Sequence, residues 1–213
     1  MRRNKYRDMY KMLSSAITPR PIAFVSTVAS DGVRNLAPFS FFNMVAFLPP
    51  LVSISMTLSP QRPKDTRENI LATKEFVLNL ISEPFAEAAN ATSVEAPAEV
   101  DEWIVSGLTE EPSTTVKPGR VRESAVSLEC ELYSYQDIYP DGADVPSTTI
   151  ILGKVKVAHV RNAVLQADGL QLDPAKLRVI SRLGGSTYAR VGEGFDIARP
   201  SWKEVKKEMG DKL

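Results

Sequence analysis

Three segments of this chain alternate apolar and polar residues with a period of two, and no other feature limits its fold as strongly. They are LVSISMTL at 51–58, SAVSLECELYSYQDI at 124–138 and STTIILGKVKVAHV at 147–160. Successive side chains of a β-strand point to opposite faces, so this period predicts strands with one apolar and one polar face. The last two segments flank YPDGADVP and are predicted to form one long hairpin.

Strands are predicted to dominate both halves of the chain. The segment IAFVSTVA leads into the turn signal SDG, VRNLAPFSFFNMVAF is predicted to be a second extended segment, and EFVLNLIS a buried strand. Helices are expected at 65–74, once or twice within 83–108, and over the charged C-terminal end. Because no composition break marks a linker, we expect one mainly β domain over residues 1–213, a barrel or a sandwich.

Charge and cysteine content narrow the classes of function. Lys+Arg and Asp+Glu both number 26, which argues against a nucleic-acid protein that relies on a basic face and gives no reason to expect a membrane partner. The single cysteine, Cys130, excludes an internal disulfide and shares a strand face with apolar residues, so a core position is expected. The basic start MRRNKYRDMYKML lacks the apolar run of a signal peptide, and we expect a soluble, cytoplasmic protein.

The catalytic inventory is sparse. His159 is the only histidine, and no GxSxG motif supplies a nucleophile for it. One histidine and one cysteine cannot build the usual zinc site, and neither GxGxxG nor GxxxxGK[ST] occurs. If the chain is an enzyme, a bound cofactor is therefore expected to carry the reaction.

The segment SPQRPKDTRENI at 59–70 raises a question of charge. Asp65 and Glu68 have capping-box spacing at a predicted helix start, where anions are favoured, yet three cations crowd it: Arg62, Lys64 and Arg67. One interpretation is a surface loop in which Arg67 pairs with a carboxylate, a contribution of about 0–1 kcal/mol.

The other interpretation is a phosphate site. Free N–H groups of the first helical turn, the Thr66 hydroxyl, and the Arg62 and Lys64 charges would then converge on one anion. Ser59, together with Ser53 and Ser55 on the polar face of the preceding strand, would complete the pocket. On the strand pattern alone, that hydroxyl row either faces solvent or lines a polar ligand.

Several stretches, in order, resemble the flavin reductase-like, FMN-binding split-barrel family. They are TPRPIAFVSTVASDGVRNLAPFSFFNMV, PPLVSISM followed by KDTRENI, EFVLNL, VRESAVSLEC, ILGKVKVAHV and SRLGGSTYAR, and together they span roughly residues 17–190. Each motif is weak alone, but the ordered set is specific. At one position, DEWIVSGLT, Trp103 stands where the family has phenylalanine, so Trp103 either alters which acceptor fits or is buried filler.

The resemblance implies a fold and an assembly. The fold is a six-stranded Greek-key split β-barrel with a helical insert, flanking helices and a C-terminal helical extension at about 200–213. The assembly is a homodimer with FMN near the subunit interface.

The resemblance also implies a set of cofactor-binding residues. The phosphate would be held by Arg62, Lys64 and Thr66, with Asp65 expected to cap the helix rather than touch the anion. The isoalloxazine ring would run beside Ala37, Pro38, Phe39 and Ser40, with Asn43, Ser53 and Ser55 as further candidates. The closing segment, Arg182, Leu183, Gly184 and Tyr188, would pack near the ring or the ribityl chain. His159 is either a hydrogen-bonded histidine of the sheet or a catalytic residue near the flavin.

The implied activity is an FMN-dependent oxidoreductase. NADH or NADPH would pass hydride to the flavin, and electrons would go on to a second acceptor or to a partner monooxygenase. Three alternatives stay open: a flavoredoxin-like electron carrier with tightly bound FMN, a non-catalytic FMN-binding module, and a structural protein with no flavin. No metal is expected in any of them.

Overall fold

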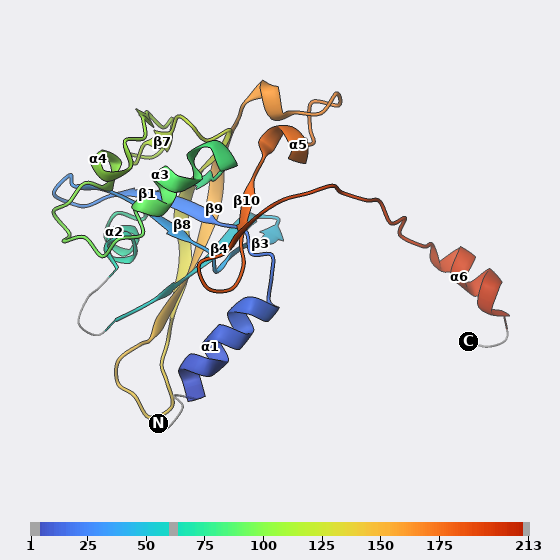
Figure 1. Ribbon diagram of the computed structural model, residues 1–213, viewed down its shortest axis with the longest axis horizontal. Helices are drawn as coiled ribbons and strands as arrows, with labels where there is room; N and C mark the ends of the chain where they lie inside the picture. The colour runs from blue at the N-terminus through green and yellow to red at the C-terminus, as the bar shows by residue number, and fades with distance from the viewer. Residues whose placement is uncertain (1–4, 60–63, 211–213) are drawn as a thin grey trace.

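The computed structural model describes residues 5–59 and 64–210 and is built on one seven-stranded antiparallel sheet (Figure 1). The strand order is β2-β1-β5-β8-β9-β4-β3. The strands are β1 (Ala23–Val28), β2 (Arg34–Phe39), β3 (Phe42–Phe47), β4 (Pro50–Thr57), β5 (Glu75–Leu80), β8 (Val126–Ile138) and β9 (Thr148–Val160). The prediction of a mainly β chain is confirmed, and β8 and β9 form the long hairpin that the alternation predicts.

Two expectations about the sheet need correction. The segment 33–47 is two strands, because β2 ends at Phe39, β3 begins at Phe42, and a bend at Ser40–Phe41 separates them. The sheet thus has seven strands rather than six. Within the described residues β2 and β3 are its two edges, so a closed barrel is not seen.

One hydrophobic core cluster packs on one face of the sheet. Val52, Ile54 and Met56 of β4 are buried as the alternation predicts, and they pack with Phe76 of β5. Cys130 belongs to the same cluster and is fully buried, and burial raises the pKa of its thiol to about 12. A thiol that stays protonated in an apolar core has a packing role, as expected.

The helical insert covers the other face of the sheet. It contains η1 (Glu83–Phe85), α3 (Ala86–Ala91) and α4 (Glu102–Ser106), and it ends at Gly107 with a left-handed backbone, φ 66°. Trp103 is buried there against Phe24 and Leu36 of the sheet. The structure therefore supports the interpretation of Trp103 as buried filler.

The remaining helices and short strands lie outside the seven-stranded sheet. They are α1 (Lys5–Ala16), α2 (Asp65–Thr73), β6 (Glu110–Glu111), β7 (Arg120–Val121), η2 (Asn162–Val164), α5 (Pro174–Leu177), β10 (Ile180–Arg182), β11 (Tyr188–Arg190) and α6 (Trp202–Met209). The C-terminal helix is confirmed: α6 begins with a capping box between Ser201 and Glu204 and lies at the end of an extended segment far from the sheet (Figure 1). None of the helices within 5–59 and 64–210 is long and apolar enough to cross a membrane.

Candidate functional site

The N-terminus of α2 lies one residue away from where the spacing places it. Lys64 occupies the N-cap position with an extended backbone (φ −88°, ψ 115°), and no side-chain capping bond is formed. Asp65 is the first helical residue, so the prediction that it caps the helix is wrong. Because the first N–H groups of a helix have no partner within the helix, this end offers donors to an anion.

A small cavity of about 160 Å³ opens at this helix end, and we call it the turn cavity. Residues from β2, from the start of α2 and from the insert meet there. The lining residues are Asn35, Ala37, Pro38, Phe39, Ser59, Lys64, Asp65, Thr66, Thr92, Ser93, Val94, Glu95, Ala96 and Glu102. The structure thus brings Ala37–Phe39 together with Ser59 and Lys64–Thr66, whereas Arg62 falls outside the described residues.

A buried polar network forms the floor of the turn cavity. The Thr66 hydroxyl, on a residue 2% exposed, donates to Asn35 Oδ1 at 2.7 Å. Asn35 Nδ2 and the Leu36 N–H both donate to Glu102 Oε2, at 3.1 and 3.3 Å. The Thr66 hydroxyl hydrogen is therefore already used within the protein, and what this residue offers a ligand is its backbone N–H.

Acidic residues outnumber basic ones among the described lining residues of the turn cavity. They include one cation, Lys64, and three carboxyl groups, those of Asp65, Glu95 and Glu102. Burial, with the nearby charge of Asp65, raises the pKa of Glu102 despite the hydrogen bonds from Leu36 and Asn35. A raised pKa favours the neutral carboxyl, which reduces the repulsion that an incoming anion would meet.

Arg67 does not contribute to this cavity. Its guanidinium pairs with Asp137 at 3.1 Å and Glu68 at 2.6 Å, and its Nε donates to the Thr149 hydroxyl at 2.6 Å. The charge of Arg67 is neutralised within the chain, as the surface-pairing interpretation predicts for this residue.

A second, larger cavity of about 500 Å³ adjoins the first and shares Pro38 and Ser93 with it. We call it the α1 cavity, because α1 forms one of its walls. The lining residues are Arg7, Tyr10, Lys11, Ser14, Arg20, Ile22, Pro38, Ser40, Asn90, Ser93, Arg182, Gly185 and Tyr188. Four of these side chains are cationic, and no described acidic residue lines the cavity.

Arg20 joins α1 to the sheet. It is only 9% exposed, and its guanidinium donates to the backbone carbonyls of Ser14, Ile17 (3.0 Å) and Leu183 (2.8 Å). A longer contact of 3.5 Å reaches the Ser40 hydroxyl. These partners are neutral oxygens, so the bonds satisfy the donors of Arg20 but leave its positive charge in place beside the cavity.

The glycine of the closing segment has a packing role. A Cβ built on Gly184 would lie 2.7 Å from Ser15 Cβ of α1, so a larger residue would push the helix away. Next to it, Gly185 has a positive φ of 61°. Gly184 thus allows the closing segment to approach α1 closely.

The opposite wall of the α1 cavity is held by aromatic and polar contacts. The Arg182 guanidinium lies 4.4 Å from the centroid of the Tyr188 ring, and Arg182 Nη2 donates to the Gly185 carbonyl at 2.6 Å. The Tyr188 hydroxyl donates to Asn90 Oδ1 at 2.8 Å. Arg182 and Tyr188 therefore lie together at one cavity, whereas Leu183 contributes a carbonyl to Arg20.

Three predicted cofactor residues lie elsewhere. Asn43 is opposite Ser53 in the β3–β4 pair, and Ser55 donates its backbone N–H to the Phe41 carbonyl. None of these three residues lines the turn cavity or the α1 cavity as the structure describes them. Of the three serines expected to complete the phosphate pocket, Ser59 lines the turn cavity.

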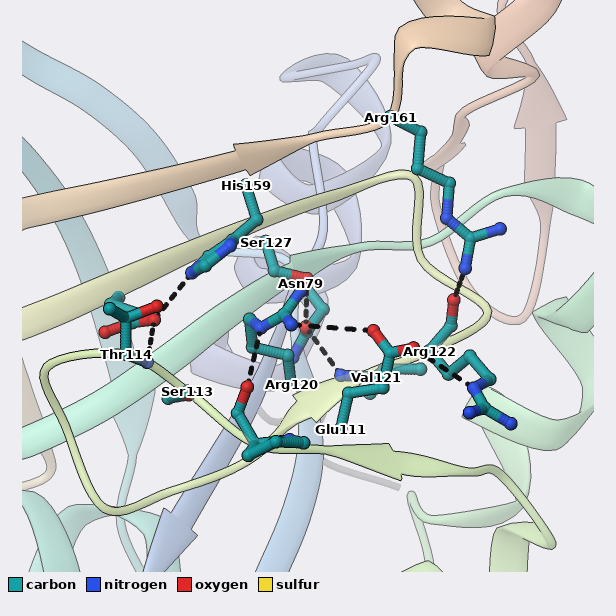
Figure 2. Close-up of polar contacts among 12 residues, drawn as sticks. Asn79, Glu111, Ser113, Thr114, Arg120, Val121, Arg122, Ser127, His159 and Arg161 are labelled. Carbon is teal, nitrogen blue, oxygen red and sulfur yellow. Dashed lines mark hydrogen bonds and ion pairs between the residues drawn. The ribbon is translucent and has the colours of Figure 1, made fainter.

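His159 lies in a different place again, at the end of β9 (Figure 2). Its Nε2 is 2.6 Å from Glu129 Oε1, and Glu129 also accepts from the backbone N–H groups of Thr114 and Thr115, each at 2.6 Å. Burial would raise the pKa of Glu129, but these bonds and the Thr115 hydroxyl lower it to about 2. His159 lines a separate hollow with Arg120 and Arg161, so the structure favours a hydrogen-bonded histidine of the sheet over a residue near the two cavities.

Comparison with known proteins identifies the class. Residues 14–177 match the flavin reductase like domain, so the chain belongs to the flavin reductase-like family. It is 40% identical over 183 residues to an uncharacterized protein of Aquifex aeolicus, covering 85% of this chain and 89% of that one.

Solved structures agree on the fold. Nitrilotriacetate monooxygenase component B from Bacillus cereus superposes with a TM-score of 0.85 at 34% identity, over 90% of this chain and 93% of that one. A split barrel domain protein from Shewanella frigidimarina superposes with a TM-score of 0.76 at 22% identity, over 92% of each chain, and shows the fold alone. The chain thus has the split-barrel flavin reductase fold, although its own sheet is open.

Proposed function

We propose that this protein is an FMN-binding oxidoreductase that uses NADH or NADPH and passes electrons to a second acceptor or a partner monooxygenase. One observation carries the proposal: the uncapped N-terminus of α2, with Lys64, opens into a cavity whose wall is Ala37–Phe39. This is the juxtaposition of anion donors and an extended strand that a phosphate joined to a flat ring requires. The family and the monooxygenase component B structure support the same assignment.

The residues present fit FMN. The first-turn N–H groups of α2 and the Lys64 ammonium would hold the phosphate, and β2, an edge strand, would offer unpaired backbone groups beside the ring. The turn cavity is too small for the whole cofactor, but it shares Pro38 and Ser93 with the larger α1 cavity, which would have to hold the rest. When bound, the flavin would supply the hydride and electron chemistry that the side chains lack.

The protein's own part is binding and electrostatics. Arg20 keeps a positive charge near Ser40, at the end of the stretch expected to run beside the ring. A fixed positive charge in a partly buried site stabilises negative charge that develops nearby without reorganisation during the reaction. No side-chain acid or base is required, which is consistent with the placement of His159 away from both cavities.

A homodimer is part of the proposal. The edge strand β3 and the turn after it expose Met44, Val45, Phe47 and Leu48, and Phe47 and Leu48 are both 82% exposed. A contiguous apolar edge of this kind is typical of a surface that a partner covers. Light scattering on the purified chain would test it, with a monomer as the contrary result.

The experiment that tests the function is anaerobic stopped-flow mixing of the FMN-loaded chain with excess NADH or NADPH. We expect the oxidised flavin absorbance to bleach at a rate that saturates with the nicotinamide. Bound flavin that resists both nicotinamides but is reduced by a protein donor would favour the electron carrier. Flavin that resists every donor would favour the non-catalytic binding module, and a chain that binds no FMN would refute all three.

A further inference from the structure

We propose that the α1 cavity binds the negatively charged group of a planar second substrate, and that Lys11 and Arg182 set its preference for anions over neutral molecules. The inference rests on the proposed function only in taking this ligand to be the molecule that meets the flavin. It assigns a ligand class and specificity residues to a cavity that lies beyond the phosphate-binding turn.

The charges of the cavity favour an anion. Arg7, Lys11, Arg20 and Arg182 line it, with no described carboxylate among the lining residues. The Arg20 and Arg182 guanidinium groups donate to backbone carbonyls, whereas several arginines elsewhere are paired with acids: Arg34 with Asp101 and Glu110, and Arg178 and Arg190 with Glu83. Because a buried cation is costly unless a negative charge is near, the nearly buried Arg20 indicates a site that an anion completes.

The shape of the cavity favours a flat ligand. Tyr10 and Tyr188 are the aromatic residues of its lining, and the Arg182 guanidinium already lies over the Tyr188 ring. A guanidinium stacked on a ring keeps its plane fixed and can pair with two oxygens of one anionic group. The volume of about 500 Å³ accommodates a substituted aromatic ring or the end of a dinucleotide.

The α1 cavity also lies next to the proposed position of the flavin ring. It reaches Pro38 and Ser40, the stretch proposed to run beside the flavin, and it shares Pro38 with the turn cavity. A molecule held by Lys11 and Arg182 would thus approach the ring from the side away from the phosphate. Lys11 comes from α1 and Arg182 from β10, so the ligand would be clamped between two elements that are distant in sequence.

The test compares benzoate with benzamide, two probes of similar shape that differ in charge. Their affinities for the full chain are measured by titration calorimetry, with and without bound FMN. We expect benzoate to bind at least about fivefold more tightly, because charge-assisted bonds replace neutral ones, and this preference to shrink at high salt.

Three variants assign the effect. Lys11→Gln and Arg182→Gln should each reduce the preference about two- to fivefold, the range of partly exposed charge pairs, while benzamide affinity changes little. Lys203→Gln on the exposed helix α6 is the matched control and should leave both affinities unchanged. Equal affinity for the two probes in the parent chain, or an unchanged preference in both cavity variants, would overturn the proposal.

Two ligand sources share this chemistry, and competition separates them. If the anion belongs to a nicotinamide dinucleotide, NADH displaces benzoate from the flavin-free chain. If it belongs to an aromatic substrate, benzoate stays bound while NADH is added. A chain that prefers benzoate but binds no FMN would refute the proposed function and leave this inference standing. A chain that binds FMN but does not prefer benzoate would refute this inference and leave the proposed function standing.

Discussion

The turn cavity and the α1 cavity share Pro38 and Ser93, yet their charges differ in sign. The turn cavity sets one lysine against three carboxyl groups among its described lining residues, and the α1 cavity has four cations and no described acid. The first would hold its anion with backbone N–H groups, which carry no net charge, and the second with side chains. If both proposals hold, phosphate binding would depend on local helix geometry, whereas recognition in the α1 cavity would depend on how α1 docks.

The largest effect is expected from Arg20→Met, which should detach α1 and so remove one wall of the α1 cavity. Arg20→Met removes the donors to three backbone carbonyls, of Ser14, Ile17 and Leu183, that tie α1 to the sheet. We expect the free energy of unfolding to fall by about 3–5 kcal/mol, because three carbonyls each lose a charged donor at a cost of about 1–3 kcal/mol. Urea unfolding measures this loss. Arg199→Met in the exposed C-terminal segment is the control, and an equal loss in both variants would contradict the role of Arg20.

Gly184→Ala should affect the α1 cavity more than the turn cavity. The added methyl would lie 2.7 Å from Ser15 Cβ, so α1 must shift outward. We expect a loss of about 1–3 kcal/mol in unfolding free energy, as for overpacking, and weakened benzoate binding. FMN affinity should change less. Gly192→Ala, where no atom crowds the new methyl, is the control; unaltered benzoate binding in Gly184→Ala would show that the close approach is not needed.

Lys64→Ala tests the turn cavity alone. It removes the one described cation of that cavity and should weaken FMN binding by about 1–2 kcal/mol, near the lower range for a bond to a charged group. Fluorescence titration of FMN gives the affinity, and benzoate binding should not change. Lys176→Ala at α5 serves as the control, and FMN affinity equal to that of the parent chain would contradict the phosphate assignment.

The smallest effect concerns Glu102. Its folded pKa is raised from 4.5, so the folded chain binds more protons than the unfolded one, and unfolding free energy should fall as pH rises from 4.5 toward the raised pKa. FMN affinity should fall over the same range, because an ionised Glu102 repels the phosphate.

Glu102→Gln keeps an acceptor for Asn35 and Leu36 but removes the charge. FMN binding should become up to about tenfold tighter above the pKa, the change that about 1.4 kcal/mol gives, and lose that pH dependence. Titrations at several pH values check it. A pH profile identical to that of the parent chain would show that Glu102 does not face the anion.

Much of the sheet could be predicted from sequence, because a period of two directly encodes which face of a strand is buried. Val52, Ile54 and Met56 are buried as that pattern requires. The bend at Ser40–Phe41 could not be predicted, since no glycine or proline marks it and Pro38 lies inside β2 instead.

The candidate site could be predicted in part. The turn and Ala37–Phe39 do meet, but the capping spacing cannot distinguish Lys64 from Asp65 as the cap residue. The hydrogen bond from Thr66 to Asn35 joins residues 31 positions apart, and the bond from Asn35 to Glu102 joins residues 67 positions apart. Local sequence patterns do not predict contacts at such separations.

The largest omission from the sequence analysis is α1. Tyr6, Met9, Tyr10 and Leu13 have helical spacing that could have revealed the helix, but its docking site could not be found that way. These four side chains stay exposed, and α1 is held instead by Arg20, by Gly184 and by the edge-on contact of Tyr10 with Phe41. Such contacts depend on the folded path of the closing segment.

The attachment of α1 has a practical consequence for work with this protein. The helix α1, at the front of the described chain, contributes four residues to the larger cavity: Arg7, Tyr10, Lys11 and Ser14. A purification tag at the N-terminus would therefore be joined to the helix that contributes Arg7 and Lys11 to the cavity proposed to bind an anion. A tag placed behind α6 would be carried on an extended segment far from the sheet (Figure 1).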